Sequence, residues 1–215
     1  MDAGDAGMDA GDAGMDAGDA GMDAGDAGMD AGGTPDAVMQ QQFYWADWTS
    51  ATTGTPGSAS GTFAAPSGTV TITYSGELRS AQTSGGTNYW LPDAPYINAV
   101  TANGPSPNTD IIRISGSALT NTVTFDPPVT GLVMGILSLG QGGANVKYVF
   151  DTNITLLSYG QGYYGNGVIA VEGTSTISGN EGHGAIQFAG TVSSISWTTV
   201  NAENWHGFTF GIPNQ

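Results

Sequence analysis

The feature that most constrains the fold is an alternation of apolar and polar residues, which recurs in short segments from residue 37 onward. Successive side chains of a β-strand point to opposite faces, so this alternation predicts strands with one buried face. Two nearly continuous apolar runs, at residues 132–139 and 154–157, predict central strands. The alternating apolar positions are Val70, Ile72 and Tyr74; Val123 and Phe125; Val146, Tyr148 and Phe150; Ile186 and Phe188; and Phe208 and Phe210.

Turn-forming residues separate these segments. Gly, Pro, Asn and Asp provide the backbone conformations and local hydrogen bonds that reverse a chain. About a dozen short strands at hairpin spacing, with no amphipathic helix among them, predict an all-β fold, a two-sheet antiparallel β-sandwich with a jelly-roll-like topology. Local spacing leaves the strand order open. The predicted turns lie at residues 66–68, 103–105, 126–128, 140–143, 166–167 and 178–180.

The chain begins with a different kind of sequence. Residues 1–33 repeat the unit Met-Asp-Ala-Gly-Asp-Ala-Gly, residues 34–37 form a predicted hinge, and residues 38–215 form the predicted β-sandwich domain. The spacing would gather the aspartates on one face of a helix, but each Gly costs about 1 kcal/mol relative to Ala there. We therefore expect an extended, acidic, low-complexity N-terminal arm. Close Ala/Gly packing in an assembly and ordering by cations are the alternatives.

Charge restricts the possible partners. The net charge is -16, and only Arg79, Arg113 and Lys147 oppose nineteen acidic residues, so long-range repulsion opposes binding to nucleic acid. The chain has no cysteine, which excludes disulfides and cysteine nucleophiles. No segment approaches the roughly 20 apolar residues of a membrane span, and no charged-then-apolar leader precedes the repeat. We expect cations, or neutral polar surfaces such as glycans, as partners.

No cofactor and no specific metal site are predicted. Calcium requires about six to eight oxygen ligands held close together, and the repeat lacks an EF-hand loop, so its aspartates would bind Ca²⁺ only diffusely. The two histidines are His183 and His206. Glu181 and His183 would share one side of a strand, but a third ligand would have to come from elsewhere. A turn-stabilising histidine is the favoured interpretation.

Catalytic motifs find little support. Residues 160–165 match the dinucleotide-binding fingerprint, but residues 168–172 resemble a strand, whereas that fingerprint needs a following helix. The match therefore indicates a glycine-rich hairpin. A glycoside hydrolase needs two facing carboxylates, and no pair stands out; a Gly-x-Ser-x-Gly elbow is absent. The carboxylates of the predicted β-sandwich domain are those of Asp47, Glu77, Asp93, Asp110, Asp126, Asp151, Glu172, Glu181 and Glu203.

The aromatic residues carry the candidate binding site. Trp90, Tyr163, Tyr164 and Trp205 lie in or beside turn-rich segments, where a sugar ring could stack on an exposed aromatic face. Core packing is the competing interpretation for all of them. It is favoured for Trp45 or Trp48 and for Trp197, which follow the strand pattern.

Several separated segments also resemble secreted β domains of the bacterial PEP-CTERM class, which exosortase systems sort to the envelope or matrix. The resemblance implies a secreted, non-enzymatic surface module of a class associated with exopolysaccharide and biofilm. It provides no catalytic residues, and the chain ends without a Pro-Glu-Pro motif. The segments that carry it are residues 47–54, 84–90, 136–141, 148–151, 182–188, 195–198 and 205–211.

Together these observations predict a non-enzymatic extracellular protein, secreted or associated with a cell surface. Its leading function is a structural or adhesive module of a surface, matrix or fibre assembly, with the acidic arm as a linker or assembly segment. Like copies of the chain, or matrix exopolysaccharide, are the expected partners. The alternative is a carbohydrate-binding module that uses the turn-associated aromatics, and a glycoside hydrolase is less favoured.

Overall fold

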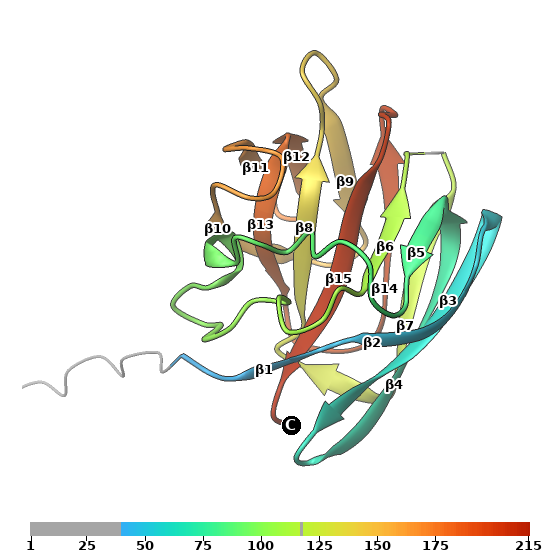
Figure 1. Ribbon diagram of the computed structural model, residues 1–215, viewed down its shortest axis with the longest axis vertical. Helices are drawn as coiled ribbons and strands as arrows, with labels where there is room; N and C mark the ends of the chain where they lie inside the picture. The colour runs from blue at the N-terminus through green and yellow to red at the C-terminus, as the bar shows by residue number, and fades with distance from the viewer. Residues whose placement is uncertain (1–39, 117) are drawn as a thin grey trace, which may run out of the picture. The chain divides into compact units, whose positions relative to one another are not determined.

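Two antiparallel β-sheets pack face to face in the computed structural model, which describes residues 40–116 and 118–215 (Figure 1). The predicted all-β, two-sheet sandwich is therefore confirmed. The acidic arm predicted at residues 1–33 and the hinge at residues 34–37 lie outside the described residues. In the described part of the chain, no helix is long and apolar enough to cross a membrane.

The seven-stranded sheet is built around the C-terminal strand of the chain. Its order is β10-β13-β8-β15-β6-β5, and a short strand, β1, pairs with the C-terminal part of β15. The strands are β1 (Phe43–Trp45), β5 (Ser80–Gln82), β6 (Ile111–Ile114), β8 (Val133–Leu139), β10 (Ile154–Tyr159), β13 (Gly182–Phe188) and β15 (His206–Pro213).

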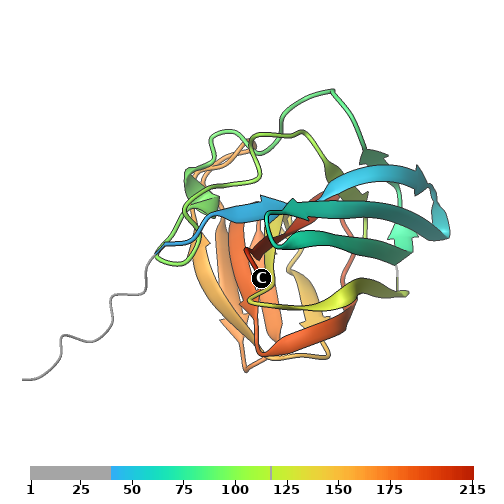
Figure 2. The same ribbon diagram turned by 90° about the horizontal axis from the view of Figure 1, so that it is seen from below.

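The eight-stranded sheet forms the other layer of the sandwich, in the order β11-β12-β9-β14-β7-β4-β3-β2. Figure 2 shows the two layers from below. The strands are β2 (Asp47–Thr52), β3 (Gly54–Ala65), β4 (Gly68–Leu78), β7 (Thr120–Thr130), β9 (Val146–Phe150), β11 (Val168–Glu172), β12 (Thr176–Asn180) and β14 (Thr191–Val200).

Eight of these strands have a jelly-roll arrangement. In the seven-stranded sheet the order is β6-β15-β8-β13, and in the eight-stranded sheet it is β7-β14-β9-β12. Following the chain, β6 to β9 alternate between the two sheets, and so do β12 to β15. This repeated crossing of sheets is the jelly-roll topology that the sequence predicted. The remaining strands extend the sheets at their edges.

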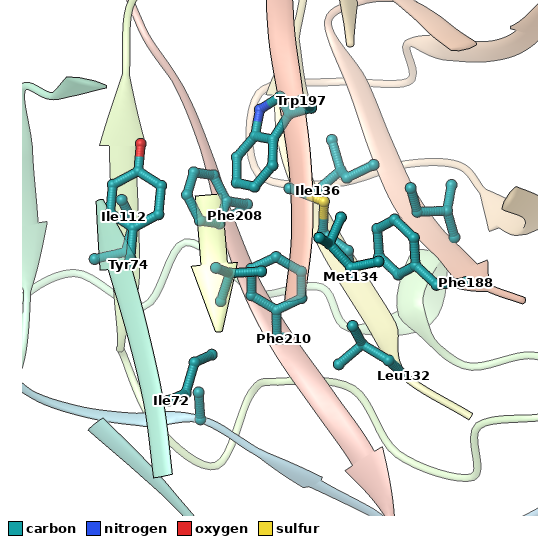
Figure 3. Packing of buried hydrophobic residues seen from close by; sticks show 14 of the residues in the cluster. Ile72, Tyr74, Ile112, Leu132, Met134, Ile136, Phe188, Trp197, Phe208 and Phe210 are labelled. Atoms are coloured by element: carbon teal, nitrogen blue, oxygen red, sulfur yellow. The ribbon is translucent and has the colours of Figure 1, made fainter. Parts of the chain in front are cut away.

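The alternating apolar residues meet between the two sheets. Tyr74 of β4, Trp197 of β14 and Phe208 of β15 pack with ring centroids 5.2–6.0 Å apart. Figure 3 shows these rings with Phe210, Phe188 and the aliphatic residues around them. Trp48 and Trp197 are fully buried and Trp45 is nearly so, which confirms their interpretation as core residues.

The seven-stranded sheet is also covered on its outer face, by the long segment between β5 and β6 (green in Figure 1). This segment contains the 3-10 turn η1 (Ala94–Tyr96) and packs Trp90 and Tyr96 against Ile111 and Leu137. Every residue of β8 is consequently buried, which confirms the central strand predicted from its continuous apolar run. The central strand predicted from the second continuous run is wrong. Ile154 and Leu156 do pack against the core, but β10 lies at the edge of its sheet and is only partly buried.

Two predicted turns lie inside strands. Asp126, Pro127 and Pro128 belong to β7, where the pairing with β14 shifts register between Val192 and Ser194, so a pairing irregularity accommodates the prolines. Residues 178–180 belong to β12. Gly179 is required there because a Cβ would lie 2.2 Å from the carbonyl oxygen of Leu139. The two predicted turns are therefore wrong: the prolines mark an irregularity in strand pairing, and Gly179 allows close packing between strands.

Candidate functional site

Four aromatic side chains from three separate loops meet at one end of the seven-stranded sheet, where β6 and β8 end and β15 begins. Tyr89 comes from the segment before β6, Tyr163 and Tyr164 from the loop before β11, and Trp205 from the residue before β15. Tyr89 lies 5.0 Å from Tyr163, 6.1 Å from Tyr164 and 5.5 Å from Trp205 between ring centroids. We call these four residues the aromatic cluster.

The aromatic cluster is exposed to solvent on part of its surface. Tyr163 and Tyr164 are 46% and 45% exposed, and Tyr89 and Trp205 are half-buried. Burial and the neighbouring Tyr89 and Tyr163 hydroxyls raise the pKa of Tyr164 to about 12, so its hydroxyl stays protonated at neutral pH. The cluster therefore presents flat apolar faces together with hydroxyl donors at the surface.

Arg113 of β6 supports the cluster. Its guanidinium carbon lies 5.3 Å from the centre of the Trp205 ring and 5.7 Å from that of Tyr89. A guanidinium over an aromatic face is attracted by the ring quadrupole, and each such contact contributes about 0.5–1 kcal/mol at partly exposed sites. Because β6 holds Arg113 in the sheet, this contact ties the two half-buried rings to the rigid scaffold.

A polar pocket of about 120 Å³ opens beside the cluster. Tyr164 and Trp205 form its aromatic wall, and Glu181 and Glu203 contribute two carboxylates. The remaining lining residues are neutral hydrogen-bonding side chains: Ser138, Gln141 and Asn204. Flat rings and convergent polar groups therefore lie side by side, and because drug-sized ligands fill about 300–1,000 Å³, a pocket of this size can take only one group of a larger ligand.

The two carboxylates differ in their surroundings. The Glu203 side chain is only 2% exposed; its Oε1 atom lies 2.6 Å from Nδ1 of buried His206 and accepts a 2.7 Å hydrogen bond from the Gly140 N–H. Glu181 is half-buried, and the Ser138 hydroxyl donates a 2.5 Å hydrogen bond to its Oε2. Glu203 is thus held in place by a histidine, whereas Glu181 has a neutral partner.

Backbone strain is concentrated at this pocket. Ser138 and Glu181 have φ values of 56° and 53°, in the left-handed region that residues other than glycine seldom adopt. Residues held in such conformations cost about 1–3 kcal/mol each and gather at functional sites, where the surrounding structure enforces them. Here the two strained residues are hydrogen-bonded to each other, and both line the same pocket.

His183 positions the loop that carries two of the aromatics. It is fully buried in β13, and its Nε2 accepts a 3.4 Å hydrogen bond from the Tyr164 N–H. Burial lowers its pKa to about 4, which keeps the ring neutral and able to accept this bond. Gly162 lies on the same ring, since a Cβ there would be 2.2 Å from His183 Cγ. His183, which the sequence predicted to stabilise a turn, therefore lies within β13 and supports the neighbouring loop. Glu181 precedes β13, so the two residues do not share one side of a strand.

Trp90 does not belong to the site. It is fully buried, packs at 5.3 Å against Tyr96, and donates its indole N–H to the Asp110 carbonyl oxygen at 3.0 Å. The candidate sugar-stacking role of Trp90 is therefore wrong. Its neighbour Tyr89 occupies the surface position, because the chain turns Trp90 inward onto the apolar residues that cover the sheet. Tyr163, Tyr164 and Trp205 do come together.

A second pair of carboxylates lies away from this pocket. Asp110 is almost fully buried, and its Oδ2 accepts a hydrogen bond from the Trp48 N–H at 3.2 Å. Burial, with a further contribution from Asp47, raises the pKa of Asp110 to about 6. The two carboxyls are too few for calcium, which needs about six to eight oxygens. Within residues 40–116 and 118–215, no group of three or more His, Asp or Glu side chains could hold a metal ion.

The site contains residues that the sequence patterns did not single out. Tyr89, Arg113, Ser138, Gln141 and Asn204 join the predicted aromatics only through folding. The adjacent aromatics Tyr89 and Trp90 were a usable signal, but a sequence does not say which of two neighbours faces outward.

Comparison with protein-family models, with curated proteins and with solved structures finds no match for this chain.

Proposed function

We propose that this β-sandwich is a non-enzymatic carbohydrate-binding module, with the aromatic cluster as its stacking surface and the adjacent pocket as its polar recognition site. The observation that carries the proposal is the convergence of Tyr89, Tyr163, Tyr164 and Trp205 beside a pocket of hydrogen-bonding side chains. Sugars combine apolar ring faces with hydroxyls, so they need both kinds of surface in one place. Core packing alone does not account for two tyrosines that are nearly half exposed.

The chemistry of the carboxylates favours binding over hydrolysis. Hydrolysis of a glycoside needs one carboxyl that delivers a proton and another that is free to act as base or nucleophile. Glu203 is almost inaccessible and is engaged by His206 and by the Gly140 N–H. Glu181 alone would supply only half of the machinery. In our proposal Glu181 accepts hydrogen bonds from ligand groups, whereas Glu203 holds the pocket wall in place through its hydrogen bond from the Gly140 N–H.

The experiment is a glycan array followed by calorimetry on the positive glycans. Trp205→Ala should lower affinity about tenfold, because truncating an aromatic anchor of a binding site commonly costs more than about 1 kcal/mol. The control is Tyr159→Ala, which removes an exposed ring of β10 that does not line the pocket and should leave affinity unchanged. Absence of binding across the array would defeat the proposal, and release of shortened products on incubation would instead establish a hydrolase.

A structural or adhesive function is the second candidate, and the open sheet edges favour it. Strand β11 ends the eight-stranded sheet and carries Val168 and Val171, which are 51% and 41% exposed. An exposed edge with apolar side chains can pair with another chain. The likeness to secreted surface domains is consistent with both candidates and with an extracellular location. Sedimentation at rising concentration, with and without calcium, tests self-association.

Residues 43–52 are a poor candidate for strand exchange with a neighbouring copy. β1 pairs with β15 and β2 pairs with β3, so this segment already completes the sheets of its own chain. Phe43, Trp45 and Trp48 are buried within the same chain. Donating this segment to a neighbour would expose three large aromatic side chains to solvent. Assembly through β11 exposes none of them and therefore costs less free energy.

A further inference from the structure

We infer that the sugar bound at this site carries a protonated amine, so that the ligand is a glycan of deacetylated hexosamine rather than a neutral one. This inference rests on the proposed function and specifies its substrate class. It starts from the conjunction of Glu181 with Tyr164 and Trp205 in one small pocket. Aromatic faces and carboxylates both attract a cation, so a protonated amine would gain from both kinds of group in this pocket.

The Glu181 carboxylate is the group that would bind the amine. It is half-buried at the pocket wall, and its hydrogen bond from the neutral Ser138 hydroxyl leaves its negative charge uncompensated. Within the described parts of the chain, no lysine or arginine lies within ion-pair distance of it; the Lys147 ammonium pairs with Glu172 instead. A partly buried carboxylate without a counter-ion gains most from a cationic partner, because the hydrogen bond is charge-assisted.

The other charged groups near the pocket are already committed. Glu203 is almost fully buried and accepts a hydrogen bond from the Gly140 N–H, and the Arg113 guanidinium lies over Tyr89 and Trp205. Arg113 opposes a second cation, but its guanidinium lies over the Tyr89 and Trp205 rings, and it is absent from the pocket lining. Ser138 and Gln141 can accept or donate hydrogen bonds to sugar hydroxyls beside the amine. The hydrogen bond from the Ser138 hydroxyl holds the Glu181 carboxylate at the pocket wall.

A charge-based preference also agrees with the net charge of the described residues. They carry nine acidic and three basic side chains, so the field of the β-sandwich attracts cationic polymers and repels anionic ones. This attraction acts over a Debye length of about 10 Å in 0.1 M salt. The pocket would then supply selectivity for a single amine.

The test uses three β-1,4-linked hexasaccharides that differ only at carbon 2 of each sugar: glucosamine, N-acetylglucosamine and glucose. Calorimetry on the whole chain at about pH 6, where the amine is protonated, should give at least about tenfold tighter binding to the glucosamine hexamer. Glu181→Gln should remove most of that preference, since it keeps the shape and hydrogen bonding of the side chain but loses its charge. Asp151→Asn removes one exposed acid away from the pocket and should leave the preference intact.

The outcomes separate this inference from the proposed function. Equal binding to all three hexamers, or a preference that survives Glu181→Gln but falls with Asp151→Asn, overturns the amine inference while the carbohydrate-binding proposal stands. Binding to none of the three, together with a negative glycan array, overturns both. A preference that disappears equally in Glu181→Gln and Asp151→Asn would reflect net charge alone and would also overturn the inference.

Discussion

The aromatic core between the sheets and the aromatic cluster at the end of one sheet are built from the same residue types but serve different purposes. Trp197, Phe208 and Tyr74 are buried on every side, and their faces are taken up by one another. Tyr163 and Tyr164 keep nearly half of their surface in solvent, beside carboxylates and amides. The difference shows that the environment, and not the residue type, decides whether an aromatic ring packs in the core or lies at the surface, where we propose that it binds a sugar.

The adjacent residues Tyr89 and Trp90 show this division most sharply. The Trp90 indole is buried against Tyr96 and donates to a backbone carbonyl, while the Tyr89 ring joins the surface cluster over Arg113. One position of sequence separates a core residue from a site residue. Variants in each region should therefore divide cleanly between loss of stability and loss of binding.

The largest expected effect comes from the core. Trp197→Ala should lower the free energy of unfolding by about 3–5 kcal/mol, because it removes a large buried ring and leaves a cavity among Tyr74, Tyr148 and Phe208. Chemical denaturation monitored by circular dichroism measures this loss. A change below about 1 kcal/mol would mean that the core is loosely packed. It would contradict the distinction between stabilising core aromatics and the surface cluster.

The next effect concerns His183, which links core and cluster. Its pKa falls from 6.5 to about 4 on folding, so the folded state binds fewer protons than the unfolded state between these values. The stability that depends on neutral His183 is therefore present above about pH 6.5 and lost as the pH falls toward 4, by about 3 kcal/mol in total. The measurement is the difference in unfolding free energy between wild type and His183→Gln across this range.

Asp110 supplies a control of opposite sign. Its pKa rises from 3.8 to about 6 on folding, so its contribution is present below 3.8 and is lost as the pH rises through 6. The unfolding free energy of wild type minus that of Asp110→Asn should therefore fall as the pH rises. The same difference measured against His183→Gln should rise. If both differences move in the same direction, burial is not the cause of these shifts.

A smaller effect is expected from the loop that rests on His183. Gly162→Ala would place a Cβ 2.2 Å from the imidazole and force the loop that carries Tyr163 and Tyr164 to move. We expect a loss of about 1–2 kcal/mol in stability together with weakened glycan binding. Gly160→Ala is the matched control, since a Cβ there has open space around it. Equal behaviour of the two variants would show that the loop is not positioned by this contact.

The smallest effect on stability should come from the surface cluster itself. Tyr163→Ala removes an exposed ring with edge contacts to Tyr89 and Tyr164, so unfolding should change by about 1 kcal/mol or less. Glycan affinity should nevertheless fall about tenfold. Thermal unfolding and calorimetry on the same preparation give both numbers. A large loss of stability would place Tyr163 with the core residues instead.

Much of the fold was predictable because strand formation depends on local pattern. The alternating residues of β4, β7, β9, β13 and β15 all direct their apolar side chains into the core, and the continuous run of β8 marks a strand covered on both faces. The errors arose where a local signal has two physical causes. Ser178, Gly179 and Asn180 resemble a turn, but the glycine is needed for contact with β8. Ile154 to Leu157 resembles a central strand, but that segment lies at an edge.

The sequence by itself determined the all-β class, the two-sheet sandwich and the aromatic residues from which a site would be chosen, because these follow from side-chain periodicity and residue type. Only the tertiary structure decided the jelly-roll strand order, the inward turn of Trp90 and the meeting of Tyr89, Tyr163, Tyr164 and Trp205. The physical reason is that these depend on contacts between residues far apart in the sequence, such as Tyr89 with Trp205 and Phe43 with Pro213. Such contacts form only when the strands that hold them have paired.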